Sequence, residues 1–162
     1  MVTITEADFH NPAHGAAIVA LLDEYATDPM GGGAPISAHV RANLIGELAR
    51  RPNAHALIAW DATGAPCGLA ISFEGFSTFA CQPLLNLHDF MVSSRARGQG
   101  VALKLLDALE GLARRLGCCK ITLEVLEGNE PARKLYLKAG YAGYALGGDT
   151  GAAQFWQKKL AA

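Results

Sequence analysis

The segment His88–Ala102 carries the residues whose types and spacing suggest chemistry. Its apolar beginning, Leu84–Val92, predicts a strand, and this strand runs into a basic, glycine-rich turn that opens a helical pattern. Glycines let a ligand approach the backbone, and the first amides of a helix are unpaired and lie at its positive dipole end. The turn around Gly98 and Gly100 is therefore predicted to bind an anionic group such as phosphate. A dinucleotide fingerprint would need a small residue where the chain has Leu103.

Other segments carry weaker chemical signals. Gly31–Gly33 lacks the GxxxxGK[ST] pattern of a phosphate loop and follows no predicted strand, so it predicts a flexible connection or a lid on the substrate side. Histidine, cysteine and acidic residues lack the spacing of metal ligands, and no metal is expected. A catalytic cysteine stays open, although no histidine-paired motif stands out. Without CxxC spacing, we expect reduced, mostly buried thiols at Cys67, Cys81, Cys118 and Cys119.

The elements that must position the turn follow from hydrophobic periodicity and from helix caps. Helices are predicted from Pro12 to about Tyr25, over about 38–50, from Gly98 to about Leu116, and from Asn129 to Gly140. Strands are predicted at Val2–Thr5, His55–Trp60, Cys67–Phe73 with an interrupted continuation, Leu84–Val92, Lys120–Leu126, Tyr141–Ala145 and Gln154–Lys159. This order predicts one α/β domain over residues 1–162 with a mixed sheet and no internal repeat.

Length and composition agree with one globular domain. The chain has 162 residues, of which 51% are hydrophobic and 18% charged, enough to bury roughly 68–70% of the unfolded surface. Its apolar stretches are far shorter than the roughly 20 residues that cross a bilayer, and the acidic start lacks an export signal. We therefore expect a cytoplasmic protein with no membrane partner.

The charge is divided unevenly along the chain. The net charge is −1, but residues 1–80 hold three basic and eight acidic side chains, whereas residues 81–162 hold eleven basic and seven acidic ones. Two interpretations are open: a chance partition over one surface, or an anionic ligand bound by the second half and a cationic one attracted by the first. Without a lysine and arginine stripe, no nucleic-acid partner is expected.

Three linked motifs stand in one order: Arg97-x-x-Gly100-x-Ala102, then Leu123-Glu124-Val125, then Asn129-x-x-Ala132-x-x-Leu135-Tyr136. Together they resemble the GNAT superfamily of acyl-CoA-dependent N-acetyltransferases, over about residues 84–145. The resemblance implies an α/β (α+β) fold, with a central mixed, mostly antiparallel twisted sheet of six to seven strands and about four flanking helices. It also implies acetyl-CoA as the cofactor and a possible homodimer.

The resemblance implies a role for each matching residue. The CoA diphosphate would be held by the backbone amides of the turn, which comprises Arg97, Gly98, Gln99, Gly100, Val101 and Ala102. Pantetheine would pair with the strand end, which comprises Phe90, Met91 and Val92. Asn129 would contact the CoA arm and Tyr136 would lie beside the sulfur. These two residues are seven positions apart, about two helical turns, and so share a face. The alternative interpretation of Asn129 is that it is only a helix cap.

Acetyl transfer to an amine needs a base, an oxyanion donor and a proton for the leaving thiolate. Tyr136 could supply the proton, the strand amide near Val92 could stabilise the oxyanion, and Asp89 could be the base, directly or through water. Glu124 and His88 are weaker candidates for the base. Packing of Tyr136 against the sheet, a structural carboxylate at Asp89 and a satisfied, partly buried His88 are the alternatives.

Within the superfamily, Leu87–Val92, Phe76–Phe79 and Asn129–Ala132 are most similar to the diamine (spermidine/spermine) and thialysine acetyltransferase branch, whose members acetylate primary amines of small, flexible cations. The branch usually has a Glu-Asp pair where this chain has His88-Asp89, which leaves one fewer carboxylate for a cation. We expect the substrate-binding residues to be Asp28, Glu74, His88 and Asp89.

The leading hypothesis is an acetyl-CoA-dependent N-acetyltransferase that acts on a primary amine of a polyamine-like or amino-acid-like small molecule. The amine would attack directly in a ternary complex. One alternative is acetylation of a protein or peptide amine. The other is a non-catalytic acyl-CoA-binding regulatory domain.

Overall fold

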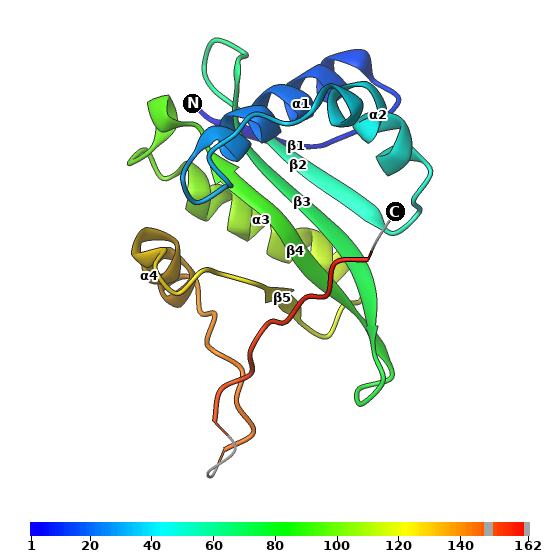
Figure 1. Ribbon diagram of the computed structural model, residues 1–162, viewed down its shortest axis with the longest axis vertical. Coiled ribbons are helices and arrows are strands. Elements are labelled where there is room, and N and C mark those ends of the chain that lie inside the picture. The colour runs from blue at the N-terminus through cyan, green and yellow to red at the C-terminus, as the bar shows by residue number, and fades with distance from the viewer. Residues whose placement is uncertain (148–150, 161–162) are drawn as a thin grey trace. The chain divides into compact units, whose positions relative to one another are not determined.

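The computed structural model describes residues 1–147 and 151–160. Within that part of the chain the elements are β1 (Thr3–Glu6), α1 (Pro12–Thr27), α2 (Ala38–Ala49), β2 (Ala54–Trp60), β3 (Pro66–Ser77), β4 (Gln82–Val92), a 3-10 turn η1 (Ser94–Ala96), α3 (Val101–Arg115), β5 (Ile121–Leu123) and α4 (Glu130–Lys138) (Figure 1). The chain divides into two compact units: the first is Met1–Leu123, and the second begins at Glu124.

The first unit contains a five-stranded sheet in the order β1-β2-β3-β4-β5. The first three neighbouring pairs are antiparallel, and β5 lies parallel to β4. Ile71 pairs with Asp89 but the next residue, Ser72, pairs with Leu87, so His88 is an extra residue of β4. This bulge locally strengthens the twist of the strand and redirects its side chains. The pairing with β5 ends at Leu87, whereas the pairing of β4 with β3 continues to Val92.

Helices cover both faces of this sheet. The α1 face carries a buried cluster that includes Ile18, Leu69 and Met91. On the other face, a Cβ added to Gly68 would lie 2.9 Å from Leu105 Cδ1, which shows how closely α3 approaches β3. Because successive strand residues point to opposite faces, the alternation in β3 supplies both layers of core. The predicted α/β class and the order of the first nine elements of regular structure are confirmed, with η1 added between β4 and α3.

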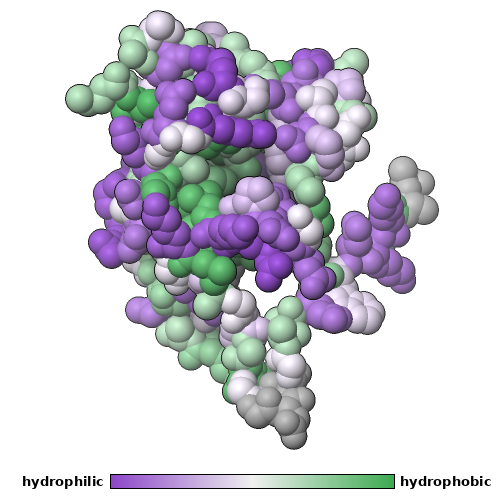
Figure 2. Space-filling view, turned by 90° about the vertical axis from the view of Figure 1, so that its left-hand side faces the viewer, coloured by the Kyte–Doolittle hydropathy of each residue, from purple (hydrophilic) through white to green (hydrophobic). Residues whose placement is uncertain are grey.

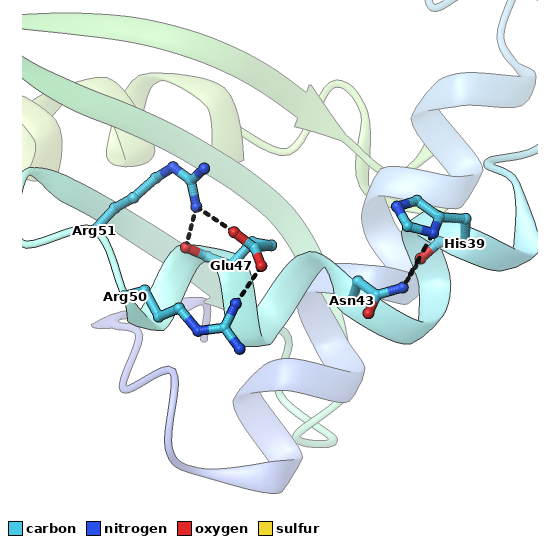
Figure 3. A network of polar contacts seen from close by, with 5 residues as sticks. All are labelled: His39, Asn43, Glu47, Arg50 and Arg51. Atoms are coloured by element: carbon cyan, nitrogen blue, oxygen red, sulfur yellow. Dashed lines mark hydrogen bonds and ion pairs between the residues drawn. The ribbon is translucent and has the colours of Figure 1, made fainter. Parts of the chain in front are cut away.

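Helix α2 shows how local sequence shapes the surface of the first unit. Ser37 caps its start by accepting a hydrogen bond from the Val40 amide. Near its end, the Glu47 carboxylate pairs with Arg50 and, at 2.9 Å, with Arg51 (Figure 3). Glu47 therefore pairs with two of the three basic residues in the acidic half of the chain, at the helix end where positive charge is favourable.

The prediction of six to seven strands is wrong for the described residues, in which the sheet has five. The predicted strands Tyr141–Ala145 and Gln154–Lys159 are absent, and one isolated bridge joins Ala145 to Ala152. Glycines break the regular extended backbone here; Gly147, for example, has a φ of 87°. Residues 151–160 are all exposed, and the end of this segment is largely hydrophilic (Figure 2), so no apolar face holds a strand in place.

The expectation of mostly buried thiols is also only partly correct. All four cysteines are free, but only Cys67 is buried and Cys118 half-buried, whereas Cys81 and Cys119 are exposed. Cys81 lies between β3 and β4 at the tip of their hairpin, and Cys119 lies in the connection after α3. Exposure follows from these positions, because the tips of connections lie outside the core.

Candidate functional site

The turn between β4 and α3 has the features of an anion site. Gly98 and Gly100 both have a φ of 76°, in the left-handed region where other residues are strained. Gly100 is the N-cap of α3 and offers no side chain to the first-turn amides, whereas Asn11, Ser37 and Asn129 cap the other three α-helices of the described chain. The start of α3 thus leaves its amides and its positive dipole end available to a ligand.

Three acidic side chains from the first half of the chain hold this turn. Glu24 of α1 accepts a hydrogen bond of 2.9 Å from the Ser94 amide. The carboxylate of Asp61, in the β2–β3 turn, pairs with Arg95, which also donates a 2.7 Å hydrogen bond to the carbonyl of Pro66. Within the turn, Gln99 Nε2 donates to the Arg95 carbonyl at 3.1 Å. The backbone of the turn is therefore fixed from outside its own segment.

The third of these acidic residues, Asp28, reaches the turn through an ion pair. Arg97 Nη2 lies 3.0 Å from Asp28 Oδ2, and Arg97 Nε donates to the Val92 carbonyl at 3.3 Å. A hydrogen bond from the Met30 amide, and then the Arg97 guanidinium, hold the pKa of Asp28 below its usual range. Asp28 is thus ionised at neutral pH and connects the α1–α2 loop to the end of β4.

The α1–α2 loop has a defined conformation. The Asp28 carbonyl accepts hydrogen bonds from the amides of Gly31 and Gly33, and Ala34 donates to Ala26. A Cβ at Gly31 would lie 1.9 Å from the Tyr25 carbonyl oxygen, so a side chain at this position cannot be accommodated without movement. The triple-glycine segment predicted as a flexible connection or lid therefore folds back over the end of α1.

His88 is the extra residue of the bulge in β4, and Asp89 follows it as the partner of Ile71. Burial raises the pKa of the Asp89 carboxyl, and the nearby His88 opposes part of that rise. His88 is exposed, and its ring contacts the edge of Phe73 with a centroid separation of 5.5 Å. A half-buried carboxyl with a raised pKa accepts a proton more readily than an exposed one, which suits a general base.

Tyr25 is a candidate site residue that the sequence prediction missed. Burial raises the pKa of its hydroxyl, and the negative charges of Asp89 and then Asp28 raise it further, which places both carboxylates near this group. Glu24, also missed, lies one helical turn before Asp28. The four-residue spacing of Glu24 and Asp28 puts both on one side of the end of α1, and this spacing could have identified the pair.

The other predicted residues of β4 and α3 lie around the same turn. Met91 is buried in the α1 face of the sheet, and Phe90 is half-buried next to it on β4. Val101 is buried and Ala102 half-buried at the start of α3. These residues therefore flank the turn in sequence, and the alternation of β4 puts Met91 on the same sheet face as Asp89 and Phe90 on the other.

Glu74 does not join this group. It neighbours Phe73, which packs on the α1 face, so the alternation of the strand points Glu74 to the opposite face. Its negative charge contributes to a raised pKa of Cys118, beyond the end of α3, although burial is the larger cause. Glu74 therefore points away from the sheet face that α1 covers, whereas Asp28 lies at the end of α1.

Asn129 and Tyr136 belong to the second unit. Asn129 caps α4, with its side-chain oxygen accepting a hydrogen bond of 3.3 Å from the Ala132 amide. Tyr136 is the buried residue of that helix and contacts the edge of Tyr141 with a centroid separation of 5.8 Å. Asn129 is therefore a helix cap, as one of the two interpretations predicted. The cap uses its side-chain oxygen, so its amide nitrogen can still contact another group. Glu124, at the start of the unit, is exposed.

Two further searches cover only residues 1–147 and 151–160. No group of three or more histidine, cysteine or acidic side chains there could hold a metal ion. None of the helices in this part of the chain has the length and apolar character needed to span a membrane.

Solved structures share this fold. A possible acetyltransferase from Clostridium difficile 630 superposes with a TM-score of 0.79 at 12% identity, covering 99% of this chain and 98% of that one. AAC(6')-Iy in complex with the bisubstrate analogue CoA-S-monomethyl-acetylneamine gives 0.75 at 17% identity, covering 99% of both chains. Ribosomal-protein-alanine N-acetyltransferase from Brucella melitensis biovar Abortus 2308 gives 0.70 at 21% identity, covering 99% and 98%.

Sequence comparisons identify the family. An uncharacterized N-acetyltransferase of Bacillus subtilis (strain 168), YycN, is 40% identical over 55 residues, which span 34% of this chain and 35% of that protein. The match thus covers about a third of the length of this curated relative. The family model of the acetyltransferase (GNAT) family matches residues 15–141, which include the turn, the bulge of β4 and α4. The chain therefore belongs to the acetyltransferase (GNAT) family, a family of acetyl-transferring enzymes.

Proposed function

We propose that the protein is an acetyl-CoA-dependent N-acetyltransferase that acts on a primary amine of a small molecule. The observation that carries the proposal is the start of α3, where Gly98 and Gly100 stand before a helix with no side-chain cap and next to Arg97. Membership of the acetyltransferase family supports CoA as the ligand of that anion site.

The residues of the turn fit the diphosphate of CoA. A Cβ built on Gly98 or Gly100 meets no protein atom within 4 Å, so the backbone is open on this side. The amides from Gly98 to Ala102 would hold the phosphate oxygens, and the end of β4 at Phe90–Val92 would hold the pantetheine arm, with Asn129 as a further contact. When bound, acetyl-CoA supplies an acetyl group activated as a thioester.

Five groups of this chain would then handle charge and protons. Asp89, through its half-buried carboxylate, takes the proton that the amine nitrogen loses as it bonds to the acetyl carbon. The strand amide near Val92 donates a hydrogen bond to the acetyl oxygen, where negative charge develops. Tyr136 donates its hydroxyl proton to the leaving sulfur. Asp28 and His88 complete the acceptor side. Glu74 lies on the other sheet face, and its predicted role in substrate binding is therefore not part of this proposal.

A small cationic amine is the preferred acceptor. Asp28 and Asp89 both place negative charge near Tyr25, and a buried ammonium group needs such charge to replace its hydration. The diamine and thialysine branch is the specific proposal. A fold neighbour named as a ribosomal-protein-alanine N-acetyltransferase keeps a protein or peptide amine as the second candidate. A non-catalytic acyl-CoA-binding domain is the third. A cytoplasmic location and a homodimer stay predictions.

A turnover screen tests the proposal directly. Purified protein is incubated with acetyl-CoA and with diamines, amino acids, aminoglycosides or peptides, and acetylated product is identified by mass spectrometry. Mass detection is preferable to a thiol reagent, because the exposed Cys81 and Cys119 would react with the reagent themselves. Transfer to small amines alone would support the proposal, and transfer to peptides alone would favour the second candidate. CoA binding without transfer to any acceptor would favour the third.

Tyr136→Phe separates catalysis from binding in the same assay. If Tyr136 donates the proton, the variant should lose roughly 100-fold in kcat while its Kd for acetyl-CoA changes by less than about twofold. Unchanged turnover would remove Tyr136 from the mechanism and leave it as a packing residue beside Tyr141.

A further inference from the structure

Arg97 links the turn to the acceptor side of the proposed site. One of its nitrogens is 3.0 Å from Asp28 Oδ2, and another donates to the carbonyl of Val92. The Arg97 side chain is 61% exposed and that of Asp28 29% exposed. An ion pair this accessible is weak, because water and salt screen it, so the guanidinium can change partners at little cost.

Asp28 keeps its position without Arg97. Its Oδ1 atom accepts a 2.9 Å hydrogen bond from the Met30 amide, and its carbonyl accepts from Gly31 and Gly33. These bonds involve only the α1–α2 loop. Loss of the ion pair would therefore leave a fixed carboxylate with an uncompensated charge.

The Asp89 carboxylate adds to this negative charge. The negative charges of Asp28 and Asp89 both contribute to the raised pKa of Tyr25, so removing the Arg97 cation leaves the negative charge near that hydroxyl less compensated. The negative charges of the two carboxylates are stabilised by a nearby cation. A primary ammonium group, with three donors and one positive charge, meets this requirement.

We propose that the diphosphate of acetyl-CoA takes Arg97 from Asp28, and that the released Asp28 then binds the ammonium group of the acceptor. This inference rests on the proposed function. A diphosphate carries more charge than a carboxylate and can accept two hydrogen bonds from the guanidinium, whereas Asp28 accepts one here, so the diphosphate wins the competition. Cofactor and cationic acceptor then each strengthen the binding of the other, as linkage requires.

Calorimetric titration with acetyl-CoA tests the exchange. Asp28→Asn keeps the oxygen that accepts from the Met30 amide but removes the charge that competes for Arg97. Its Kd for acetyl-CoA should fall by about two- to fivefold, the range expected for an exposed ion pair. In an Arg97→Gln background, Asp28→Asn should leave the Kd unchanged, because the pair no longer exists.

Asp23→Asn is the matched control. Asp23 is 26% exposed, lies on α1 shortly before Asp28, and also pairs with an arginine, Arg41, which is outside the turn. This variant should leave the Kd for acetyl-CoA unchanged. Thermal unfolding of every variant verifies the fold independently of activity.

The outcomes separate the two proposals. Wild-type protein that binds and uses acetyl-CoA, with no tighter binding by Asp28→Asn, overturns the exchange and leaves the proposed function standing. Wild-type protein that does not bind acetyl-CoA overturns both. For any amine that the turnover screen identifies, Asp28→Asn should also raise the acceptor KM severalfold. Tighter binding of acetyl-CoA together with a higher acceptor KM supports the exchange. An unchanged acceptor KM overturns the proposal that the released Asp28 binds the ammonium group.

Discussion

Arg95 and Asp61 form an ion pair across 34 positions of the sequence, between the turn that precedes α3 and the β2–β3 turn. Asp61 also accepts hydrogen bonds from the hydroxyl and amide of Thr63 and from the amide of Ala65. One carboxylate thus shapes its own turn and fixes a second one. The hydrogen bond from the Thr63 hydroxyl, and then the pairing with Arg95, lower the pKa of Asp61 strongly.

This lowered pKa predicts how Asp61→Asn changes stability with pH. The pairing of the ionised carboxylate stabilises the folded chain above the unfolded-chain pKa of about 3.9, and this contribution is lost as the pH falls below that value. The Tm of the variant should therefore lie below that of the wild type near neutral pH, and the difference should shrink in acid. Thermal unfolding by circular dichroism at a series of pH values measures it, and a constant difference would contradict the assignment.

Asp89→Asn should show the opposite sign. Burial raises the pKa of this carboxyl, so its ionised form costs stability above the raised value, and the cost disappears once the pH falls below the unfolded-chain pKa. Near neutral pH the variant should therefore have a higher Tm than the wild type, and the difference should shrink in acid. The variant should also lose roughly 100-fold in kcat if Asp89 is the base. A variant that is less stable and fully active would contradict both roles.

Gly100→Ala compared with Gly117→Ala isolates ligand binding from backbone strain. Both glycines have left-handed φ values, 76° and 70°, and a Cβ at either position meets no protein atom within 4 Å. Both variants should lose about 1–2 kcal/mol of stability from the backbone conformation. Only Gly100→Ala should weaken acetyl-CoA binding, because Gly117 lies at the other end of α3. Equal affinities in a binding titration would remove the diphosphate from this turn.

Gly68→Ala tests the close packing of α3 on the sheet. The new Cβ would lie 2.9 Å from Leu105 Cδ1 and 3.3 Å from the Met91 carbonyl oxygen. Overpacking of this kind costs about 1–3 kcal/mol, so the midpoint of denaturant unfolding should fall. Combining it with Leu105→Val, which shortens the opposing side chain, should cost less than the sum of the two single variants. Strict additivity would mean that the two side chains do not meet.

The turn itself was predictable because its determinants are local. Glycine spacing and the strand-to-helix change of period are visible in the segment Leu84–Leu116, and the structure confirms the strand, the turn and the helix there. The side chains that hold the turn were not predictable in this way. Glu24 and Asp61 meet Ser94 and Arg95 only because α1 and the β2–β3 hairpin fold against β4, and no local pattern encodes that approach.

The two predicted strands that the structure lacks were mispredicted because strand formation depends on tertiary packing and not on local sequence alone. Tyr141–Ala145 and Gln154–Lys159 have residues that suit a strand, but a strand needs a partner edge and a face to bury. Exposed Phe155 and Trp156 show that the apolar residues of the second segment do not enter a core. Local propensity was a poor guide where tertiary packing decides.

The ion pairs also explain the uneven distribution of charge. Glu6, Asp28 and Asp61, from the acidic half, pair with Arg115, Arg97 and Arg95 from the basic half, across 109, 69 and 34 positions. Part of the asymmetry is therefore neutralised within the first unit. During synthesis, the emerging N-terminal half carries unmatched acidic groups until its arginine partners have been translated, so the nascent chain is an anion whose own later segment supplies the counter-charge.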